Sequence, residues 1–263
     1  MEEDFSKYNG EGSTLRKAQL RMLDILVEVD KICRKHNITY WLDFGTLLGA
    51  IRHKGFIPWD DDLDISVMRK DYKRLRKALQ KELPQNLIFQ DETTEKYYAY
   101  KFWKVRDKNS KIIDLSWNDK VKELGLYIDI FPIERGAVKM KTFVDFFYGR
   151  AFRRIKYFNE NNKKERCIAY FIWPFVSFLV LLVRMFSFIV PQNLLIHSYG
   201  SYNGMFQLKK TYIFPLTSIS FEGKEFSCVA NPDRYLKELY GNYMEIPPED
   251  KRRVHASEII FYD

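Results

Sequence analysis

The chain has 263 residues, of which 46% are hydrophobic and 30% charged, and its net charge is +8. This composition is typical of a folded globular protein and excludes a disordered, collagen-like or coiled-coil chain. The N-terminal segment is acidic and polar and carries no apolar run of the kind that a secretion signal needs. We therefore expect a cytoplasmic protein, or one that lies peripherally on the inner face of the cell membrane.

The first part of the chain predicts helices that alternate with short strands. Apolar residues recur at helical spacing over residues 13–36, and Ser13 or Thr14 can cap the start of this helix. Strands are expected over residues 38–42 and in the second half of the DDDLDISV run, with a glycine-containing turn and the short helix LLGAIR between them. A charged helix is expected over residues 71–82.

The middle and end of the chain predict more strands and two further helices. LIFQ, YYAYKFWKVRD, KIIDLSW and GLYIDIF are strand candidates, with DKNS as a hairpin turn. Residues 141–158 predict a basic helix, and a second helix begins at Asn231 and Pro232 and ends at Gly241. Because helices and strands mix without strict alternation, we predict an α+β fold with a mixed β-sheet flanked by helices.

A long apolar segment follows the basic helix. Residues 167–183 carry no charge, whereas the stretch from Arg150 to Arg166 holds seven Lys or Arg and two Glu. Three interpretations remain: a helix or helical hairpin in the membrane interface, a buried core or dimer helix, and a true span. Pro174 and Arg184 weigh against a span, which needs roughly 20 mostly apolar residues.

We favour the interfacial interpretation. The flanking cations would meet anionic headgroups while the aromatic side chains enter the acyl boundary. The cations are Arg153, Arg154, Lys156, Lys163, Lys164 and Arg166, and the aromatic residues are Phe171, Trp173, Phe175 and Phe178.

Three acids are the candidate catalytic and metal-binding residues. In a strand, Asp62 and Asp64 point to the same face, where two carboxylates repel each other unless a cation lies between them. Asp129 is a lone acid among apolar strand residues, which is costly unless it is paired or bound to a metal. Oxygen ligands suit Mg²⁺, so the three carboxylates together could hold two such ions. A solvated turn or a calcium loop is the alternative, but the run lacks the spacing and closing Glu of an EF-hand.

Upstream of the acids, Gly45 and Thr46 precede the short helix. Backbone N–H groups and a threonine hydroxyl at the start of a helix can bind a phosphate. We therefore predict a phosphate-binding turn at this point.

Three stretches of the sequence resemble the LicD family. They are DFGTLLGAIRHKGFIPWDDDLDI, YIDIFPIE and YLKELYGNYMEIPPEDKRRVHA, the last with Asn242 where the family usually has Asp. LicD proteins are similar to the nucleotidyltransferase superfamily, so the resemblance implies a nucleotidyltransferase-like sheet with a helical apolar insertion. On this basis we predict a catalytic core over residues 1–140, a membrane-associating insertion over 141–210 and the remainder of the catalytic domain over 211–263.

The resemblance also implies an activity. LicD proteins are linked to transfer of phosphocholine from CDP-choline to a sugar hydroxyl on cell-surface glycans, and the similar fukutin-related proteins transfer ribitol phosphate from CDP-ribitol. Asp62 and Asp64 match the family's metal-binding pair, Asp129 its third acid, and Gly45 and Thr46 its phosphate turn. The expected cofactor is Mg²⁺ or Mn²⁺. The expected partners are CDP-choline or another CDP-alcohol, a glycan acceptor that the apolar segment suggests is lipid-linked, and a membrane surface.

Within this scheme Asp129 would position and deprotonate the acceptor hydroxyl, and CMP would leave. We expect Arg52, Lys101 and Lys251 to bind phosphates. Aromatic side chains could hold the choline ammonium by cation–π attraction, although at strand positions they more often pack in a core. The aromatic candidates are Trp59, Tyr97, Tyr98, Tyr100, Trp103, Trp117 and Tyr127.

Other functions remain open. A nucleotidyltransferase that moves a nucleotide from an NTP onto a small molecule or protein would release pyrophosphate in place of CMP. A catalytically inactive module that binds a membrane surface is a second alternative, against which the complete set of three acids argues. We expect no nucleic-acid partner, because the chain shows no recognition motif.

Overall fold

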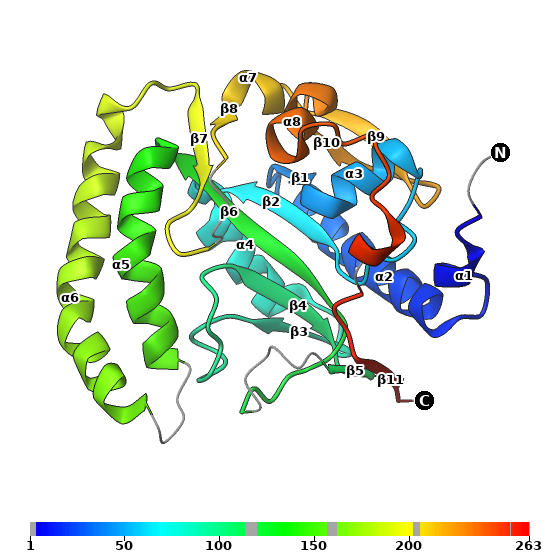
Figure 1. Cartoon of the computed structure of the whole chain (residues 1–263), viewed down its shortest axis with the longest axis horizontal. Helices are drawn as coiled ribbons and strands as arrows, with labels where there is room; N and C mark the ends of the chain where they lie inside the picture. The colour runs from blue at the N-terminus through cyan, green and yellow to red at the C-terminus, as the bar shows by residue number, and fades with distance from the viewer. Residues whose placement is uncertain (1–3, 114–119, 157–161, 202–205, 253, 263) are drawn as a thin grey trace.

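A computed structural model describes residues 4–113, 120–156, 162–201, 206–252 and 254–262 of the chain. Figure 1 shows a curved mixed sheet with helices packed around it and a pair of long helices beside one edge. The predicted α+β fold is confirmed. The strands of the main sheet are β1 (Tyr40–Leu42), β2 (Asp64–Met68), β3 (Leu87–Gln90), β4 (Trp103–Asp107), β6 (Tyr127–Arg135), β7 (Leu194–His197) and β8 (Leu208–Lys209).

The strand order β1-β2-β6-β4-β3 places β2 and β6 at the centre of the sheet. These two strands run parallel, whereas the other strand pairs that the described residues form run antiparallel. Two small sheets lie outside the main one. They consist of β9 (Thr217–Phe221) with β10 (Lys224–Cys228), and β5 (Ser110–Ile113) with β11 (Glu258–Phe261).

One face of the main sheet is closed by α2 (Thr14–Lys35) and α4 (Arg69–Glu82). The Ser13 side chain accepts a hydrogen bond from the Arg16 backbone N–H, which confirms the predicted cap. Ile65 of β2 and Ile130 of β6 are fully buried in this apolar core. Because side chains alternate along a strand, Asp64 and Asp129 project from the opposite face.

That opposite face is bordered by α3 (Phe44–Arg52) and by the C-terminal part of the chain. There α8 (Pro232–Tyr240) begins and ends at the predicted residues. The Asn231 side chain caps its start by accepting a hydrogen bond from the Arg234 N–H, and Gly241 just after its end has φ of +66°. The remaining short elements are α1 (Ser6–Asn9), α7 (Lys210–Ile213) and the 3-10 turns η2 (Phe186–Ile189) and η3 (Glu249–Lys251).

The long pair beside the sheet consists of α5 (Val138–Lys156) and α6 (Lys163–Met185), which the chain inserts between β6 and β7. The two helices pack through a small second core in which Trp173 stacks on Tyr148 with ring centroids 5.0 Å apart. The stretch Lys163–Ile189 is long and apolar enough to cross a membrane, and few of its residues are buried inside the protein.

The predicted insertion boundary at residue 210 is too late. β7 returns to pair with β6, and β8 pairs with β7, so both strands belong to the main sheet. The helical insertion therefore ends before residue 194. At the other end of the chain, β11 pairs with β5, which joins the C-terminal segment to the N-terminal part of the fold.

The predicted hairpin at DKNS is wrong. β4 pairs with β3 and β6, whereas β5 pairs with β11, so the strands on either side of this turn do not pair with each other. Strand β4 also begins only at Trp103, and the end of the KIIDLSW run lies outside the described residues. Long-range pairing with the C-terminus decides the position of β5, which local turn chemistry does not reveal.

Candidate active site

Three ionisable side chains lie side by side across the centre of the main sheet. The parallel register of β2 and β6 places Asp64 opposite Asp129, and the antiparallel register of β4 places Lys104 opposite Asp129. Cross-strand partners project from the same face of a sheet. The Nζ atom of Lys104 lies 2.5 Å from Oδ1 of Asp129, and both side chains are nearly buried.

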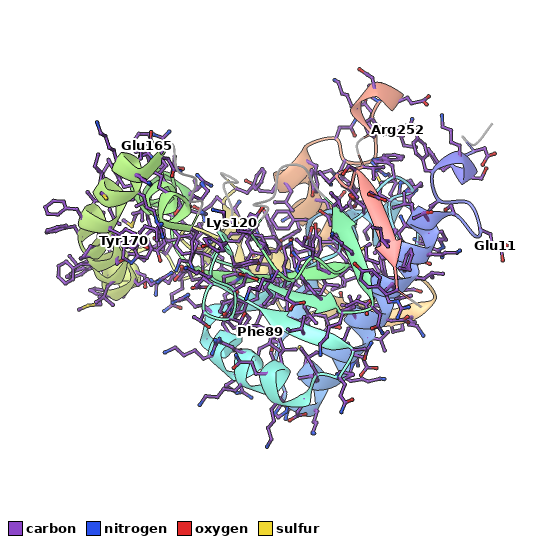
Figure 2. All side chains as sticks on the ribbon, turned by 90° about the horizontal axis from the view of Figure 1, so that it is seen from below. Glu11, Phe89, Lys120, Glu165, Tyr170 and Arg252 are labelled. Atoms are coloured by element: carbon purple, nitrogen blue, oxygen red, sulfur yellow. The ribbon has the colours of Figure 1, made fainter. Side chains whose placement is uncertain are left out.

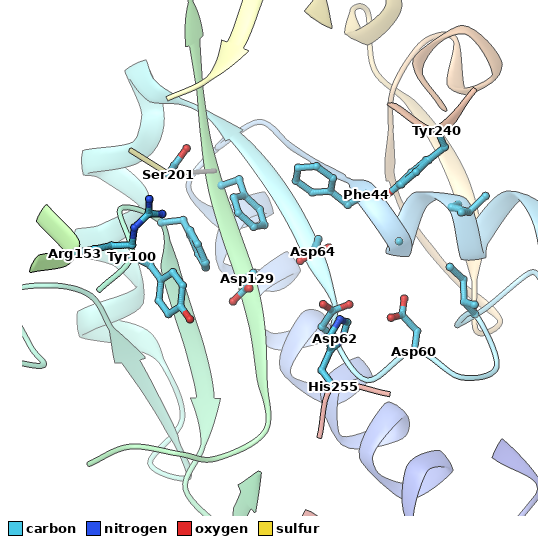
Figure 3. A pocket seen from close by; sticks show the side chains of 15 residues that line it. Phe44, Asp60, Asp62, Asp64, Tyr100, Asp129, Arg153, Ser201, Tyr240 and His255 are labelled. Carbon is cyan, nitrogen blue, oxygen red and sulfur yellow. The ribbon is translucent and has the colours of Figure 1, made fainter. Parts of the chain in front are cut away.

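The acids line a cavity of about 550 Å³. Figure 3 shows the side chains of Asp60, Asp62, Asp64 and Asp129 around it. The three predicted acids are therefore brought together, and Asp60 joins them. The rest of the lining comes from Phe44, Gly45, Leu48, Ile57, Tyr100, Phe102, Phe131, Arg153, Ser201, Tyr240 and His255.

Burial and mutual repulsion raise the pKa of each acid in this group. The pKa values of Asp60 and Asp64 lie well above the ordinary value, first because of burial and then because of neighbouring carboxylates. The pKa of Asp62 is raised for the same reasons, chiefly by burial and by the neighbouring carboxylate of Asp61. Burial raises the pKa of Asp129 to about 6 against the opposing effect of Lys104, whose own pKa burial lowers to about 8.

This set of donors fits a hard divalent cation. All four side chains offer carboxylate oxygens, which are the ligands that Mg²⁺ prefers. Among the described residues, no hydrogen-bond donor or cation contacts the Asp64 carboxylate. A buried carboxylate without a partner is costly, and a divalent cation between these side chains would remove that cost.

A second acidic group lies beside the first. One ligand atom from each of Asp60, Asp61 and His255 falls within 4.8 Å of the others. The Asp61 carboxylate, however, accepts hydrogen bonds from the backbone N–H groups of His255 and Ala256 and contacts Nδ1 of His255 at 3.0 Å. We therefore assign Asp61 to anchoring the C-terminal segment against the site.

Asp43 is buried and has a structural role. Its carboxylate accepts hydrogen bonds from the Phe44 N–H at 2.8 Å, from the Tyr235 hydroxyl at 2.7 Å and from the Ser66 hydroxyl at 2.5 Å, and it lies 3.2 Å from Nε2 of His197. Burial alone would raise the pKa of Asp43, but these contacts prevail and lower it. This side chain joins α3, β2, β7 and α8 behind the cavity.

The two residues of the predicted phosphate turn, Gly45 and Thr46, have different positions in the structure. Gly45 lines the cavity, and a Cβ atom there would lie 2.7 Å from a carboxylate oxygen of Asp60, so a larger residue would force the Asp60 side chain to move. Thr46 is buried, and its hydroxyl accepts a hydrogen bond of 2.7 Å from the Asp64 backbone N–H. The Thr46 hydroxyl thus positions Asp64, and phosphate binding at this turn stays a prediction.

The basic residues predicted to bind phosphate do not line this cavity. The Arg52 guanidinium donates hydrogen bonds to the backbone carbonyls of Tyr243 and Glu245, which attaches the C-terminal segment to α3. Lys251 is exposed on η3. Their places in the sequence suggested proximity to the acids, but their side chains reach other partners or solvent.

Lys101 also lies elsewhere, since it pairs with Glu92 at 3.1 Å and sits 4.1 Å from the ring centre of Phe152. Of the described residues, Arg153 on α5 and the imidazole of His255 in the C-terminal segment do line the cavity. Sequence analysis assigned Arg153 to membrane contact. Only the packing of α5 beside the sheet shows that it lies at the acidic site (Figure 3).

Aromatic rings form much of the remaining wall. Of the predicted choline-binding candidates Tyr100 lines the cavity, whereas Trp103 stacks on Tyr72 at a ring distance of 3.3 Å. Trp117 lies outside the described residues. The other aromatic wall residues are Phe44, Phe102, Phe131 and Tyr240.

A mixed sheet that presents acids from adjacent strands beside a glycine turn defines a nucleotidyltransferase-like domain. Residues 37–159 match the family model described as LicD/FKTN/FKRP, nucleotidyltransferase domain. Residues 37–159 of the protein therefore form a LicD-family domain, as its sequence motifs predict.

Named relatives extend this match. The chain is 29% identical to the lipopolysaccharide cholinephosphotransferase LicD of Haemophilus influenzae, over 92% of the chain and 96% of that protein. It is 50% identical to the human ribitol 5-phosphate transferase FKRP over 34 residues, which are 13% of the chain and 7% of that protein. An uncharacterized protein of Rickettsia prowazekii is 41% identical over 78 residues, which are 30% of the chain and 28% of that protein. The similarity to LicD therefore extends well beyond the 37–159 domain.

Proposed function

We propose that the protein transfers phosphocholine from CDP-choline to a hydroxyl group of a cell-surface glycan or of its lipid-linked precursor, with release of CMP. The observation that carries this proposal is the pairing of Asp64 with Asp129 inside a cavity walled by carboxylates and aromatic rings. The extended similarity to LicD of Haemophilus influenzae supports phosphocholine as the transferred group. The aromatic wall is compatible with a quaternary ammonium, which such rings attract.

Asp62, Asp64 and Asp129 are the residues that would hold Mg²⁺, or Mn²⁺ in its place. When bound there, a divalent cation would neutralise the negative charge of the diphosphate. The protein's own contribution is to hold these carboxylates in register, through the β2–β6 pairing and the Thr46 hydroxyl.

In the transfer step, the acceptor oxygen forms a bond to the choline-bearing phosphorus while the bond from that phosphorus to the CMP oxygen breaks. Asp129 accepts the proton of the hydroxyl group, a role for which its carboxylate is placed inside the cavity beside Asp64. Lys104 holds the Asp129 carboxylate in place. Arg153 and His255 line the cavity wall and contact the phosphate oxygens in this scheme.

The test is product analysis with purified protein. CDP-choline, CDP-ethanolamine, CDP-ribitol and CDP-glycerol are each incubated with Mg²⁺ and a glycan extract, and CMP is measured. We expect CMP from CDP-choline with the native protein and with the control Asp24→Asn, which changes an exposed acid on α2, and no CMP with Asp64→Asn. Pyrophosphate release from an NTP, without CMP from any CDP-alcohol, would support a nucleotidyltransferase instead.

We also propose that the α5–α6 pair rests on the inner face of the cell membrane. Phe171, Phe175 and Phe178 of α6 are between 59% and 74% exposed, and Phe143 of α5 is 61% exposed. Figure 2 shows side chains, including the ring of Tyr170, projecting outward from this pair. Such an uncovered apolar surface on a protein with a basic charge excess suits the interface of an anionic bilayer.

The cations that support this contact are fewer than the sequence suggests. Arg153 lines the cavity, Lys156 donates to the Glu92 backbone carbonyl, and Trp173 packs inward on α5. Lys163 and Lys164 remain exposed at the start of α6. The membrane proposal therefore depends chiefly on the aromatic surface and on these two lysines.

Vesicle sedimentation tests the membrane proposal. We expect the native protein to pellet with vesicles that contain anionic lipid and the double variant Phe171→Ser, Phe175→Ser to remain largely in solution. Leu20→Ser, which changes an exposed apolar residue on α2, is the control and should pellet normally. Sedimentation of the double variant equal to that of the native protein would contradict the proposal.

A further inference from the structure

A second cavity, of about 460 Å³, lies where α4, α5, α6 and the segment after β7 meet. Its lining has no residue in common with that of the acidic cavity. Tyr100 lines the acidic cavity and Lys101 the second one, so the 100–102 segment forms part of the wall between them. The cationic lining residues of the second cavity are Arg69, Lys70, Lys73, Arg76, Lys101 and Arg184.

The negative charges of the nearby acids do not neutralise the positive charges of these cations. Asp91 pairs with Arg76 at 2.8 Å, and Glu92 pairs with Lys101. Two guanidinium groups share one remaining acid, because Glu134 lies 2.9 Å from Arg184 and 3.5 Å from Arg69. Lys70 and Lys73 are exposed, and within the described chain no acid pairs with either of them. The cavity therefore carries a local excess of positive charge.

A buried hydroxyl group gives a second and independent indication of a ligand. Ser198 lines this cavity and is 1% exposed, and its hydroxyl has no hydrogen-bond partner among the described residues. Its backbone is held in place, since its N–H donates to the Pro132 carbonyl and its own carbonyl accepts from the Ser201 N–H. A buried hydroxyl without a partner is unfavourable, and a ligand oxygen would supply that partner.

We propose that this second cavity binds the phosphate group of a phosphate ester, with Arg69, Arg184 and Ser198 as its ligands. Guanidinium groups match phosphate oxygens in geometry as well as in charge, and a phosphate carries enough negative charge to offset the excess. Arg184 belongs to α6, whose outer surface is apolar, so the ester is either part of a lipid or a soluble phosphate. This site is distinct from the transfer chemistry proposed above.

Binding is tested on the full-length protein in EDTA, where the carboxylates of the acidic cavity repel anions. Inorganic phosphate and pyrophosphate are titrated by calorimetry into the native protein, Arg69→Gln and Ser198→Ala. We expect binding that weakens about tenfold or more in both variants, because a hydrogen bond to a charged group is lost in each. Ser198→Ala should keep the native melting temperature, since its hydroxyl has no protein partner to lose.

Two control variants test whether phosphate binding depends on this cavity and not on any surface cation or on the acidic cavity. Lys17→Gln removes an exposed charge on α2, and Asp64→Asn changes the acidic cavity; both should bind phosphate as the native protein does. No binding at millimolar phosphate, or equal binding by Arg69→Gln, Ser198→Ala and the native protein, would overturn the proposal. Tighter phosphate binding in Asp64→Asn than in the native protein would assign the anion to the acidic cavity, because this variant lowers the repulsion there, and would also overturn the proposal.

Vesicles then distinguish the two sources of the phosphate. Neutral phosphatidylcholine vesicles are compared with vesicles that also contain phosphatidic acid, a phosphate monoester of a lipid. A preference for phosphatidic acid that Arg69→Gln removes and Lys17→Gln retains would identify the ligand as a lipid phosphate. The same vesicle binding by both variants, together with variant-sensitive binding of soluble phosphate, would identify a soluble ester.

Discussion

At the scale of single residues, the site places like charges together in apolar surroundings. Asp64 and Asp129 are each 7% exposed, and burial together with neighbouring carboxylates raises their pKa values. The folded metal-free protein therefore binds more protons than the unfolded chain between about pH 4 and the raised pKa values. Its free energy of unfolding receives a contribution from these acids that falls as pH rises through this window.

This reasoning predicts that Asp64→Asn stabilises the metal-free protein while abolishing transfer. At pH 7.5 the variant should melt at a higher temperature than the native protein in EDTA, because a buried charge is removed. The difference should shrink at pH 5, where the native carboxyl binds a proton. Thermal melts at both pH values check this, with Asp24→Asn as the control. A variant that melts below the native protein at pH 7.5 in EDTA would contradict the argument.

Thr46 gives a second prediction at this scale. Thr46→Val leaves the buried Asp64 N–H without its acceptor, which should lower the free energy of unfolding by about 1–3 kcal/mol. Because Asp64 is then held less firmly, the rate constant of transfer should fall more than the apparent affinity for the donor. Thr46→Ser keeps the hydroxyl and should restore both quantities. Equal losses in Thr46→Ser and Thr46→Val would show that packing, and not the hydrogen bond, is responsible.

At the scale of elements, the site depends on segments that are remote in the chain. The C-terminal segment is attached through Asp61 to the loop before β2 and through Arg52 to α3. This attachment brings His255 to the cavity. The acids alone therefore do not make the site. The wall that contains His255 is held in place by hydrogen bonds between the C-terminal segment and residues near the start of the chain.

The element-level prediction concerns this attachment. Asp61→Asn replaces an oxygen acceptor by an amide NH₂, which cannot accept the N–H groups of both His255 and Ala256. The C-terminal segment should then be cleaved faster by trypsin at Lys251 and Arg252, while the melting temperature of the rest changes little. Limited proteolysis followed by mass spectrometry measures this. Cleavage at the native rate would show that other contacts suffice.

At the scale of the whole molecule, the α5–α6 pair contributes to the acidic cavity, to the second cavity and to the exposed aromatic surface that we propose rests on a membrane. Arg153 of α5 lines the acidic cavity, whereas Arg184 of α6 lines the basic one. The outer surface of the same pair is aromatic and exposed. A protein built in this way would hold its active site close to a lipid-linked acceptor.

The whole-molecule prediction follows from the two exposed lysines. Near an anionic surface each Lys contributes about 1 kcal/mol, so the double variant Lys163→Gln, Lys164→Gln should bind anionic vesicles roughly thirtyfold more weakly. Binding to neutral vesicles should change little, and the native protein should lose affinity as salt rises. An unchanged partition of the double variant on anionic vesicles would remove the electrostatic part of the membrane proposal.

The sequence alone determined the α+β class, most of the helices, the three candidate acids and the presence of a long apolar segment. These features follow from local periodicity, capping residues and the cost of burying a lone carboxylate, all of which can be judged from neighbours along the chain. Only the tertiary structure decided that Asp64 and Asp129 lie opposite each other, that Lys104 pairs with Asp129 and that Arg153 lines the same cavity as the acids. It also showed that Arg52 and Lys101, which were predicted to bind phosphate at the acidic site, lie outside that cavity. Strand register and helix packing join residues far apart in the chain, and no local pattern specifies which of them meet.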